Sequence, residues 1–438
     1  MHNLALALQA KGDLITGSDD AIFEPSKSRL RDKGLLPDEM GWFPEKIHSK
    51  LDAIILGMHA KADNPELLRA QELGLKIYSY PEFLYEHSKN KTRVVIGGSH
   101  GKTTITSMIL HVLKYHEIEV DFMVGAQLEG FDRMVHLTTD NEIIVLEGDE
   151  YLSSPIDLRP KFHLYHANIA LISGIAWDHI NVFPTYENYL DQFRIFIDTI
   201  VKGGTIIYNQ DDPEVRKVVE ESKNQVKKYP YGTPAYRIEN GLTLLETNEG
   251  EIPLEVFGEH NLQNLEGARS VCFHLGVGEE EFYEAIADFS GASKRLEKIG
   301  ESKSSVIYKD FAHSPSKVEA TTRAVKEQYP DRTLLACLEL HTYSSLNETF
   351  LKEYRGALDK ADQAVVFYSP HAVQIKRLKE VGAEQIAEAF QRDDLLIYTD
   401  PLSFKEYLFA QDLSDKVLLL MSSGNYGGLD FDEVKELL

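Results

Sequence analysis

The residues best suited to chemistry stand in one short loop, Gly97-Gly98-Ser99-His100-Gly101-Lys102-Thr103-Thr104. Residues 92–96 before it are mostly β-branched and predict a buried strand, while residues 105–113 after it have apolar positions at helical spacing. Glycines let backbone N–H groups approach an anion, a helix N-terminus carries positive potential, and Lys102 adds a charge. Thr103 would offer its hydroxyl to Mg²⁺. This shortened G-x-x-G-K-T-T pattern therefore predicts that a nucleoside triphosphate binds here.

Carboxylates and a histidine follow two further predicted strands. Residues 142–146 predict a buried strand that ends at Glu147-Gly148-Asp149-Glu150-Tyr151. Carboxylates at the carboxyl end of a strand suit Mg²⁺, although a solvated acidic turn is an equally good interpretation. The strand predicted over residues 167–174 leads to His179. A single histidine is more often structural, but its place after a strand of the same segment favours a functional role.

Two asparagines stand near the start of a predicted helix. Asn261 and Asn264 are separated by three residues and would share a helix face. Their amides could present a donor and an acceptor to a nucleotide base, although asparagines at a helix start are more often caps. In the last segment, polar residues again follow predicted strands, at residues 310–315, 339–343 and 422–425. In open α/β sheets such strand ends face the ligand crevice.

Composition limits the classes of function. A chain of 438 residues predicts two or three domains, and a net charge of −24 argues against general binding to nucleic acid or anionic membranes. Cys272 and Cys337 have apolar neighbours and no metal-ligand spacing, which predicts buried thiols. No apolar run is long enough to span a bilayer, and the first residues lack a signal-peptide pattern. We therefore expect a cytoplasmic protein.

Strand and helix patterns alternate along the chain and predict an α/β fold with doubly wound parallel sheets. The first segment, 1–88, opens on a helix and has no strand or glycine turn before it. Its predicted elements are helices at 2–11 and 64–73 and strands at 13–16, 52–57 and 76–80. The second segment, 89–297, begins with the phosphate loop. The third, 298–438, contains predicted strands at 306–308, 334–338, 364–368, 395–398 and 417–421.

In their order along almost the whole chain, these motifs resemble the Mur ligase family, the ATP-dependent amide ligases of peptidoglycan assembly. The resemblance implies an N-terminal Rossmann-like UDP-sugar domain lacking its first strand and glycine turn, a central P-loop ATPase-like domain and a C-terminal Rossmann-like acceptor domain. It also implies residue roles: the phosphate loop for ATP, Thr103, Glu147 and His179 for Mg²⁺, Asn261, Asn264, Arg295 and Asp310 for the nucleotide, and His313 and His341 for substrate.

Within the family the chain is most similar to the murein peptide ligase branch. Tyr151, residues 157–162 and residues 421–428 carry this similarity, whereas residues 341–344 are closer to the branch that adds free L-alanine. The resemblance implies that UDP-N-acetylmuramate is activated by ATP as an acyl phosphate and that the amine of L-Ala-γ-D-Glu-meso-diaminopimelate then attacks it. Lys102 would contact the β- and γ-phosphates, and His179 would hold a second Mg²⁺. The resemblance implies that the partners are small-molecule substrates, with no nucleic acid and no membrane. It also implies a monomer or a homodimer.

The chain also departs from the family pattern. Gly174 and Ala176 replace an asparagine and an acidic residue, Ser314 replaces a histidine, and the glycine turn that would hold the UDP pyrophosphate falls before Met1. A misplaced start codon or a trimmed sequence would account for the missing turn. Two alternatives stay open: a ligase that uses free L-alanine, and a nucleotide-binding relative that has lost the ligase reaction.

Overall fold

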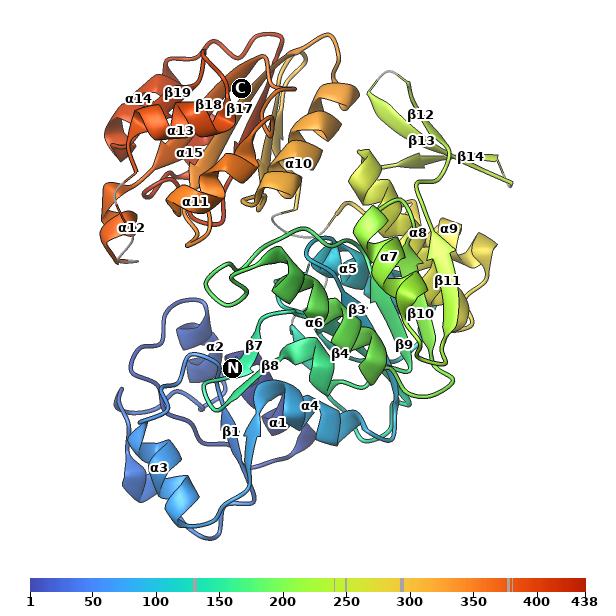
Figure 1. Cartoon of the computed structure of the whole chain (residues 1–438), viewed down its shortest axis with the longest axis vertical. Helices are drawn as coiled ribbons and strands as arrows, with labels where there is room; N and C mark the ends of the chain where they lie inside the picture. Colours follow the sequence, from blue (N-terminus) through green and yellow to red (C-terminus); the bar gives the residue numbers. More distant parts are fainter. Residues whose placement is uncertain are drawn as a thin grey trace. The chain divides into compact units, whose positions relative to one another are not determined.

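The computed structural model describes residues 1–128, 131, 133–239, 241–248, 250–291, 295–375, 379 and 381–438 (Figure 1). Its strands form mostly parallel sheets with helices between successive strands, so the predicted α/β class is confirmed. Among these residues, no helix is both long enough and apolar enough to cross a membrane.

The N-terminal segment contains one short parallel sheet, in which β1 pairs with β2 and Ile54 lies opposite Ile77. The helix predicted at 64–73 forms because the Asn64 side chain accepts hydrogen bonds from the backbone of Glu66 and Leu67. The strand predicted at 13–16 is wrong: Leu14 is fully exposed, so its apolar side chain has no face to bury. The elements are α1 His2–Lys11, α2 Ser26–Asp32, η1 Pro44–Lys46, β1 Ile54–Leu56, α3 Pro65–Glu72, β2 Ile77–Ser79 and α4 Tyr80–Ser88.

A seven-stranded sheet follows, in the order β11-β10-β9-β3-β6-β4-β5. Strands β10, β9, β3, β6 and β4 pair in parallel, and β5 pairs antiparallel with β4. The strands are β3 Thr92–Gly97, β4 Asp121–Met123, β5 Val135–His136, β6 Ile143–Gly148, β9 Ile169–Ile172, β10 Thr205–Asn209 and β11 Lys227–Tyr231. The helices are α5 Lys102–Tyr115, η2 Lys161–Leu164, α6 Tyr186–Thr199, α7 Pro213–Glu221, α8 Glu259–His274 and α9 Glu279–Ile286.

Two small antiparallel sheets interrupt this pattern, and the sequence did not predict them. One is a hairpin of β7 Leu152–Ser154 and β8 Asp157–Pro160. The other consists of β12 Tyr236–Glu239, β13 Leu242–Thr247 and β14 Gly250–Leu254. Their strands are short and mix polar with apolar residues, so they lack the continuous apolar runs by which the parallel strands were recognised.

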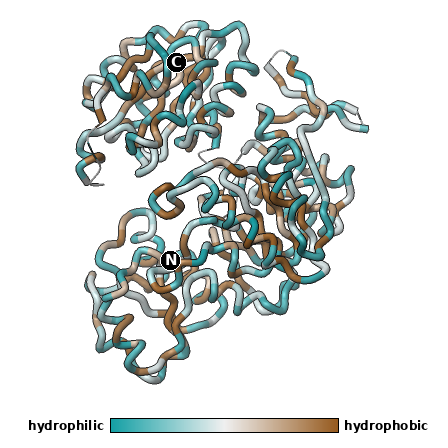
Figure 2. Tube along the Cα trace, viewed as in Figure 1, coloured by the Kyte–Doolittle hydropathy of each residue, from teal (hydrophilic) through white to brown (hydrophobic). Residues whose placement is uncertain are grey.

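The last sheet has six strands in the order β15-β16-β20-β17-β18-β19. All five predicted strands are present, and the antiparallel edge strand β15 is additional. Figure 2 shows hydrophobic residues concentrated on these strands, which form two cores, one on each face. The strands are β15 Glu297–Glu301, β16 Val306–Asp310, β17 Thr333–Leu340, β18 Gln363–Tyr368, β19 Leu396–Tyr398 and β20 Lys416–Met421. The helices are α10 Pro315–Gln328, α11 Glu348–Leu351, η3 Lys352–Tyr354, α12 Pro370–Ile375, α13 Ala383–Phe390, α14 Pro401–Phe409 and α15 Phe431–Lys435.

Candidate active site

Three neighbouring strands position the candidate residues. The central strand β3 pairs in parallel with β9 on one side and with β6 on the other, so that Val94 is level with both Ile169 and Val145. Parallel neighbours end at the same edge of a sheet. The phosphate loop follows β3, the acidic residues 147–150 end β6, and residues 174–179 follow β9. Segments far apart in the sequence therefore meet at one carboxyl edge.

The phosphate loop has the backbone that its glycines suggest. Gly98 has φ 135° and Gly101 has φ 78°, a region that side chains disfavour, and α5 begins directly at Lys102. Ser99 fastens the loop to the segment after β9: its N–H donates to the Gly174 carbonyl at 3.0 Å, and its Oγ accepts from the Ala176 N–H at 2.9 Å. Thr103 and Thr104 are both buried in the first turn of the helix. Binding of a nucleotide by these loop residues stays a prediction.

His100 of the same loop packs against Gly174. A Cβ atom at residue 174 would lie 2.2 Å from Cε1 and 2.3 Å from Nε2 of the imidazole, so the ring occupies the space of a side chain. This contact gives a structural reason for glycine at a position where the family pattern has asparagine. Burial, with the nearby charges of Lys317 and Lys102, lowers the pKa of His100 to about 3, and the ring is therefore neutral near pH 7.

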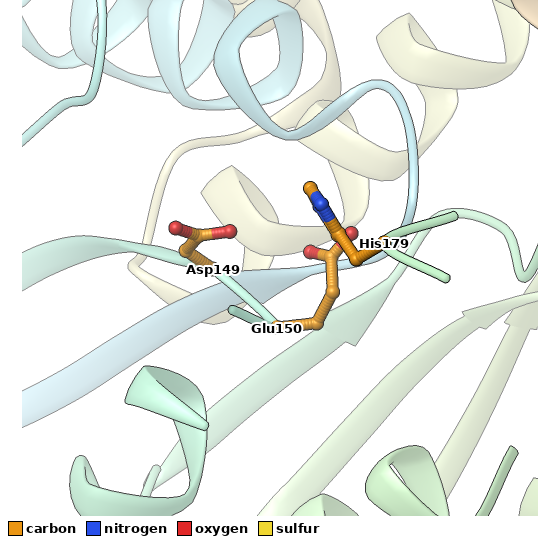
Figure 3. Close-up of side chains that lie close together, drawn as sticks. All are labelled: Asp149, Glu150 and His179. Atoms are coloured by element: carbon orange, nitrogen blue, oxygen red, sulfur yellow. The ribbon is translucent and has the colours of Figure 1, made fainter. Parts of the chain in front are cut away.

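Two carboxylates and one histidine lie close together at this edge. Asp149, Glu150 and His179 each offer a ligand atom within 4.8 Å of the others (Figure 3). Glu150 is buried, and Asp149 also accepts a hydrogen bond from Lys161 Nζ at 2.5 Å. Carboxylate oxygens with one imidazole nitrogen form a donor set that can hold a divalent cation.

Glu147, the carboxylate predicted as a metal ligand, is not in this group. Its Oε2 accepts a hydrogen bond from the Gly125 N–H at 3.0 Å, which joins the end of β6 to the loop after β4. The sequence analysis treated the carboxylates at this strand end together as suited to Mg²⁺, but it named only Glu147 as a ligand and not Asp149 or Glu150. Their approach to His179 depends on the pairing of β6 and β9 with β3, which a linear pattern does not display.

His179 itself has a backbone conformation that is uncommon for a residue with a side chain, with φ 55°. Its N–H donates to Asp178 Oδ1 at 2.7 Å, and Lys317 Nζ lies 3.8 Å from Asp178 Oδ2. Burial raises the pKa of the Asp178 carboxyl, but His179, Lys317 and His313 outweigh it and the pKa is lowered. The ionised Asp178 therefore fixes the segment that presents His179.

The two candidate asparagines lie on α8 and are both buried. Asn261 Nδ2 donates to the Phe257 carbonyl at 2.9 Å, one turn back along the chain. This bond holds the entry to α8, where Gly258 has φ 87°. The N-cap of α8 is Gly258 and no side chain caps the helix, so the capping interpretation is wrong for Asn261 and Asn264. Contact of these two residues with a nucleotide base stays a prediction.

Arg295 and Asp310 each contact a residue next to the other where the central segment meets the last one. Asp310 accepts from the Leu296 N–H at 3.1 Å and from Thr321 Oγ1 at 2.6 Å, and Arg295 lies over the Phe311 ring at 4.9 Å. His313 is held by its Nδ1, 2.7 Å from the Phe311 carbonyl oxygen. Burial, with the charge of Lys317, lowers the pKa of His313 to about 3. The structure therefore gathers Arg295, Asp310 and His313 around one short segment.

The last candidate, His341, follows β17 and is separate in the sequence from the residues above. Its ring Nδ1 lies 3.6 Å from Oε1 of Glu339, a buried carboxylate that was not among the candidate residues. The only sequence signal for Glu339 was its place at the end of a predicted strand.

Known proteins of one family match nearly the whole chain. Residues 96–272 match the Mur ligase middle domain, and residues 294–424 match the family described as Mur ligase, glutamate ligase domain. The UDP-N-acetylmuramate–L-alanine ligase of Carboxydothermus hydrogenoformans is 30% identical over 442 aligned positions, covering 97% of this chain and 92% of that protein.

Two solved structures show the same fold. A murein peptide ligase from Psychrobacter arcticus matches with a TM-score of 0.69 and 21% identity, covering 100% of this chain and 96% of that one. A UDP-N-acetylmuramate–alanine ligase from Thermotoga maritima matches with a TM-score of 0.71 and 18% identity, covering 100% and 95%.

Proposed function

Because the chain belongs to the Mur ligase family of ATP-dependent, C–N bond-forming ligases, we propose that it joins UDP-N-acetylmuramate to a peptide amine. The muramate carboxylate attacks the γ-phosphate of ATP and gives an acyl phosphate and ADP. The amine of L-Ala-γ-D-Glu-meso-diaminopimelate then attacks the acyl carbon, and phosphate leaves. This route needs no protein nucleophile, so the protein contributes positioning and neutralisation of charge.

The observation that carries this proposal is the edge where β9, β3 and β6 end together. Lys102 contacts the β- and γ-phosphates, and the N-terminus of α5 directs backbone N–H groups at them. The donor set of Asp149, Glu150 and His179 fits Mg²⁺ and would hold an ion that neutralises phosphate charge, while Thr103 and Glu147 would hold the Mg²⁺ expected at the phosphate loop. Residues 1–88 bind the UDP-sugar, 89–297 bind ATP and 298–438 bind the acceptor.

The acceptor assignment rests on sequence similarity at Tyr151, residues 157–162 and residues 421–428. A second candidate acceptor is free L-alanine. It is favoured by residues 341–344 and by the name of the Carboxydothermus hydrogenoformans relative, a UDP-N-acetylmuramate–L-alanine ligase.

Phosphate release from ATP tests the proposal directly. The enzyme is supplied with UDP-N-acetylmuramate and either the tripeptide or L-alanine, with Lys102→Ala as the control that retains the fold and loses turnover. Release only with the tripeptide supports the proposal, and release only with L-alanine replaces the acceptor. ATP binding without release in either tube would refute ligase activity. Near-normal turnover by a folded Lys102→Ala variant would refute the phosphate-loop assignment.

A further inference from the structure

A buried carboxylate, Glu339, lies at the carboxyl edge of the last sheet and has no role in the proposed ligase reaction as given above. Glu339 is the next-to-last residue of β17 and is only 2% exposed. Ser422 Oγ donates to its Oε2, and the Tyr426 N–H donates to the same oxygen at 2.8 Å. Both donors come from the segment that follows β20, the strand beside β17. Glu339 thus joins two adjacent strand ends.

The surroundings of Glu339 keep it ionised and fixed. The Tyr426 hydroxyl lies 2.7 Å from the Cys337 carbonyl and 2.9 Å from the Met421 carbonyl, so the residue that donates its N–H to Glu339 is anchored to both strands. Burial raises the pKa of the Glu339 carboxyl, but its contacts with His341, Ser422 and Tyr426 outweigh this effect and lower the pKa. A charged oxygen is therefore held in place at pH 7.

The other oxygen of this carboxylate faces His341. Glu339 Oε1 lies 3.6 Å from His341 Nδ1, and the imidazole side chain is 43% exposed. Gly424 makes the close approach possible: a Cβ atom there would lie 2.7 Å from Glu339 Oε2 and 3.0 Å from the His341 ring. Among the residues that the structure describes, two titratable residues contact this carboxylate. They are His341, from the loop after β17, and Tyr426, through its backbone N–H.

A buried carboxylate behind a half-exposed imidazole holds the ring in one orientation. An amine acceptor reaches the enzyme largely as an ammonium ion near pH 7, because an α-amino group has an ordinary pKa of about 8. An ammonium ion has no lone pair and cannot attack an acyl carbon. One proton must therefore leave the nitrogen before the C–N bond forms.

Building on the proposed function, we propose that Glu339 is a positioning residue that orients His341 to accept the proton from the acceptor's ammonium group. The ammonium proton moves to the imidazole, and the freed lone pair forms the bond to the acyl carbon. The C–O bond to phosphate breaks, phosphate leaves with that electron pair, and the second nitrogen proton passes to solvent. His341 carries the proton, and Glu339 acts through His341 without touching the acceptor.

The experiment separates activation of the carboxylate from transfer to the amine. Hydroxylamine traps an acyl phosphate as a hydroxamate, so it reports activation in the absence of acceptor. His341→Gln should lower kcat with the tripeptide by about 100-fold, within the range for a lost general base. Glu339→Gln should lower it by about 10-fold, because the base remains and only its orientation is lost. Hydroxamate formation should stay near wild type in both variants. Raising the pH from 7 to 9.5 should restore most of the loss in both variants, because the acceptor is then already a free amine.

A matched control is Glu301→Gln, which removes an exposed carboxylate paired with Lys298 on the same sheet and should change neither reaction. If the wild-type enzyme forms no hydroxamate, the proposed function fails. If it forms hydroxamate but both variants transfer to the tripeptide at wild-type rates, the assignment of Glu339 and His341 is overturned. A loss that is equal at pH 7 and 9.5 would also overturn it, because a purely structural defect is not repaired by free amine. Since His341 is half-exposed, its variant tests the proposal even if Glu339→Gln does not fold.

Discussion

The carboxylate of Asp121 offers the clearest quantitative test of the fold. It is fully buried at the start of β4 and accepts five hydrogen bonds. Its donors are Lys91 Nζ at 2.6 Å, His87 Nε2 at 3.1 Å, Thr138 Oγ1 at 2.8 Å, Thr138 N at 2.9 Å and Asn141 Nδ2 at 3.1 Å. They come from α4 and from the residues just before β3 and β6. This network lies at the amino ends of the strands whose carboxyl ends form the candidate site.

The magnitude follows from the titration of this group. Burial raises the pKa of Asp121, but the bonds from His87, Lys91 and Thr138 outweigh it and lower the pKa to about 2 from an ordinary 3.8. The lowered folded-state pKa contributes about 2.4 kcal/mol of stability above pH 3.8, and this contribution is lost as the pH falls toward 2. Asp121→Asn removes it and leaves the buried Lys91 ammonium without its counter-ion, so we expect a loss of about 3 kcal/mol at pH 7.

Urea unfolding followed by circular dichroism measures this loss of stability. The matched control is Asp140→Asn, which makes the same change at an exposed aspartate nearby in the sequence. The difference between wild type and Asp121→Asn should shrink by roughly 1 kcal/mol between pH 7 and pH 3. Turnover per folded molecule should stay at the wild-type level, because the network is at the opposite edge from the site. A difference below about 1 kcal/mol at pH 7, or one that grows as the pH falls, would refute this reasoning.

Three further outcomes are expected. Gly174→Ala should weaken ATP binding by about 10-fold in calorimetry, because its Cβ would displace the His100 ring at a cost of about 1.4 kcal/mol; an unchanged Kd would contradict the packing argument. Tyr426→Phe should lower the free energy of unfolding by about 1–2 kcal/mol, since it leaves the Cys337 and Met421 carbonyls without this hydroxyl; equal stability would remove its anchoring role. Burial raises the pKa of both cysteine thiols, so a thiol reagent at pH 8 should label neither in the native protein and both in urea; rapid native labelling would show that one is accessible.

Local patterns predicted many elements because their causes are local. The phosphate loop was recognised from glycines and a lysine between a strand and a helix, and the structure has β3 and α5 at those places. The buried strands β17 and β20 were recognised because both of their faces are apolar. The short strands β12 and β14 were missed because their mixture of polar and apolar residues gives no comparable signal. The same apolar rule wrongly predicted a strand at 13–16, where Leu14 finds no partner surface.

The sequence by itself determined the α/β class, the family and the place of the glycine loop between a strand and a helix, since each is contained in consecutive residues or in the order of motifs. Only the tertiary structure decided which distant side chains meet. It brings Asp149 and Glu150 to His179, packs His100 into the space at Gly174, and joins Glu339 to Ser422 across 83 residues. The physical reason is the parallel sheet: strand order and register place the strand ends at one edge, and no spacing along the chain encodes that order.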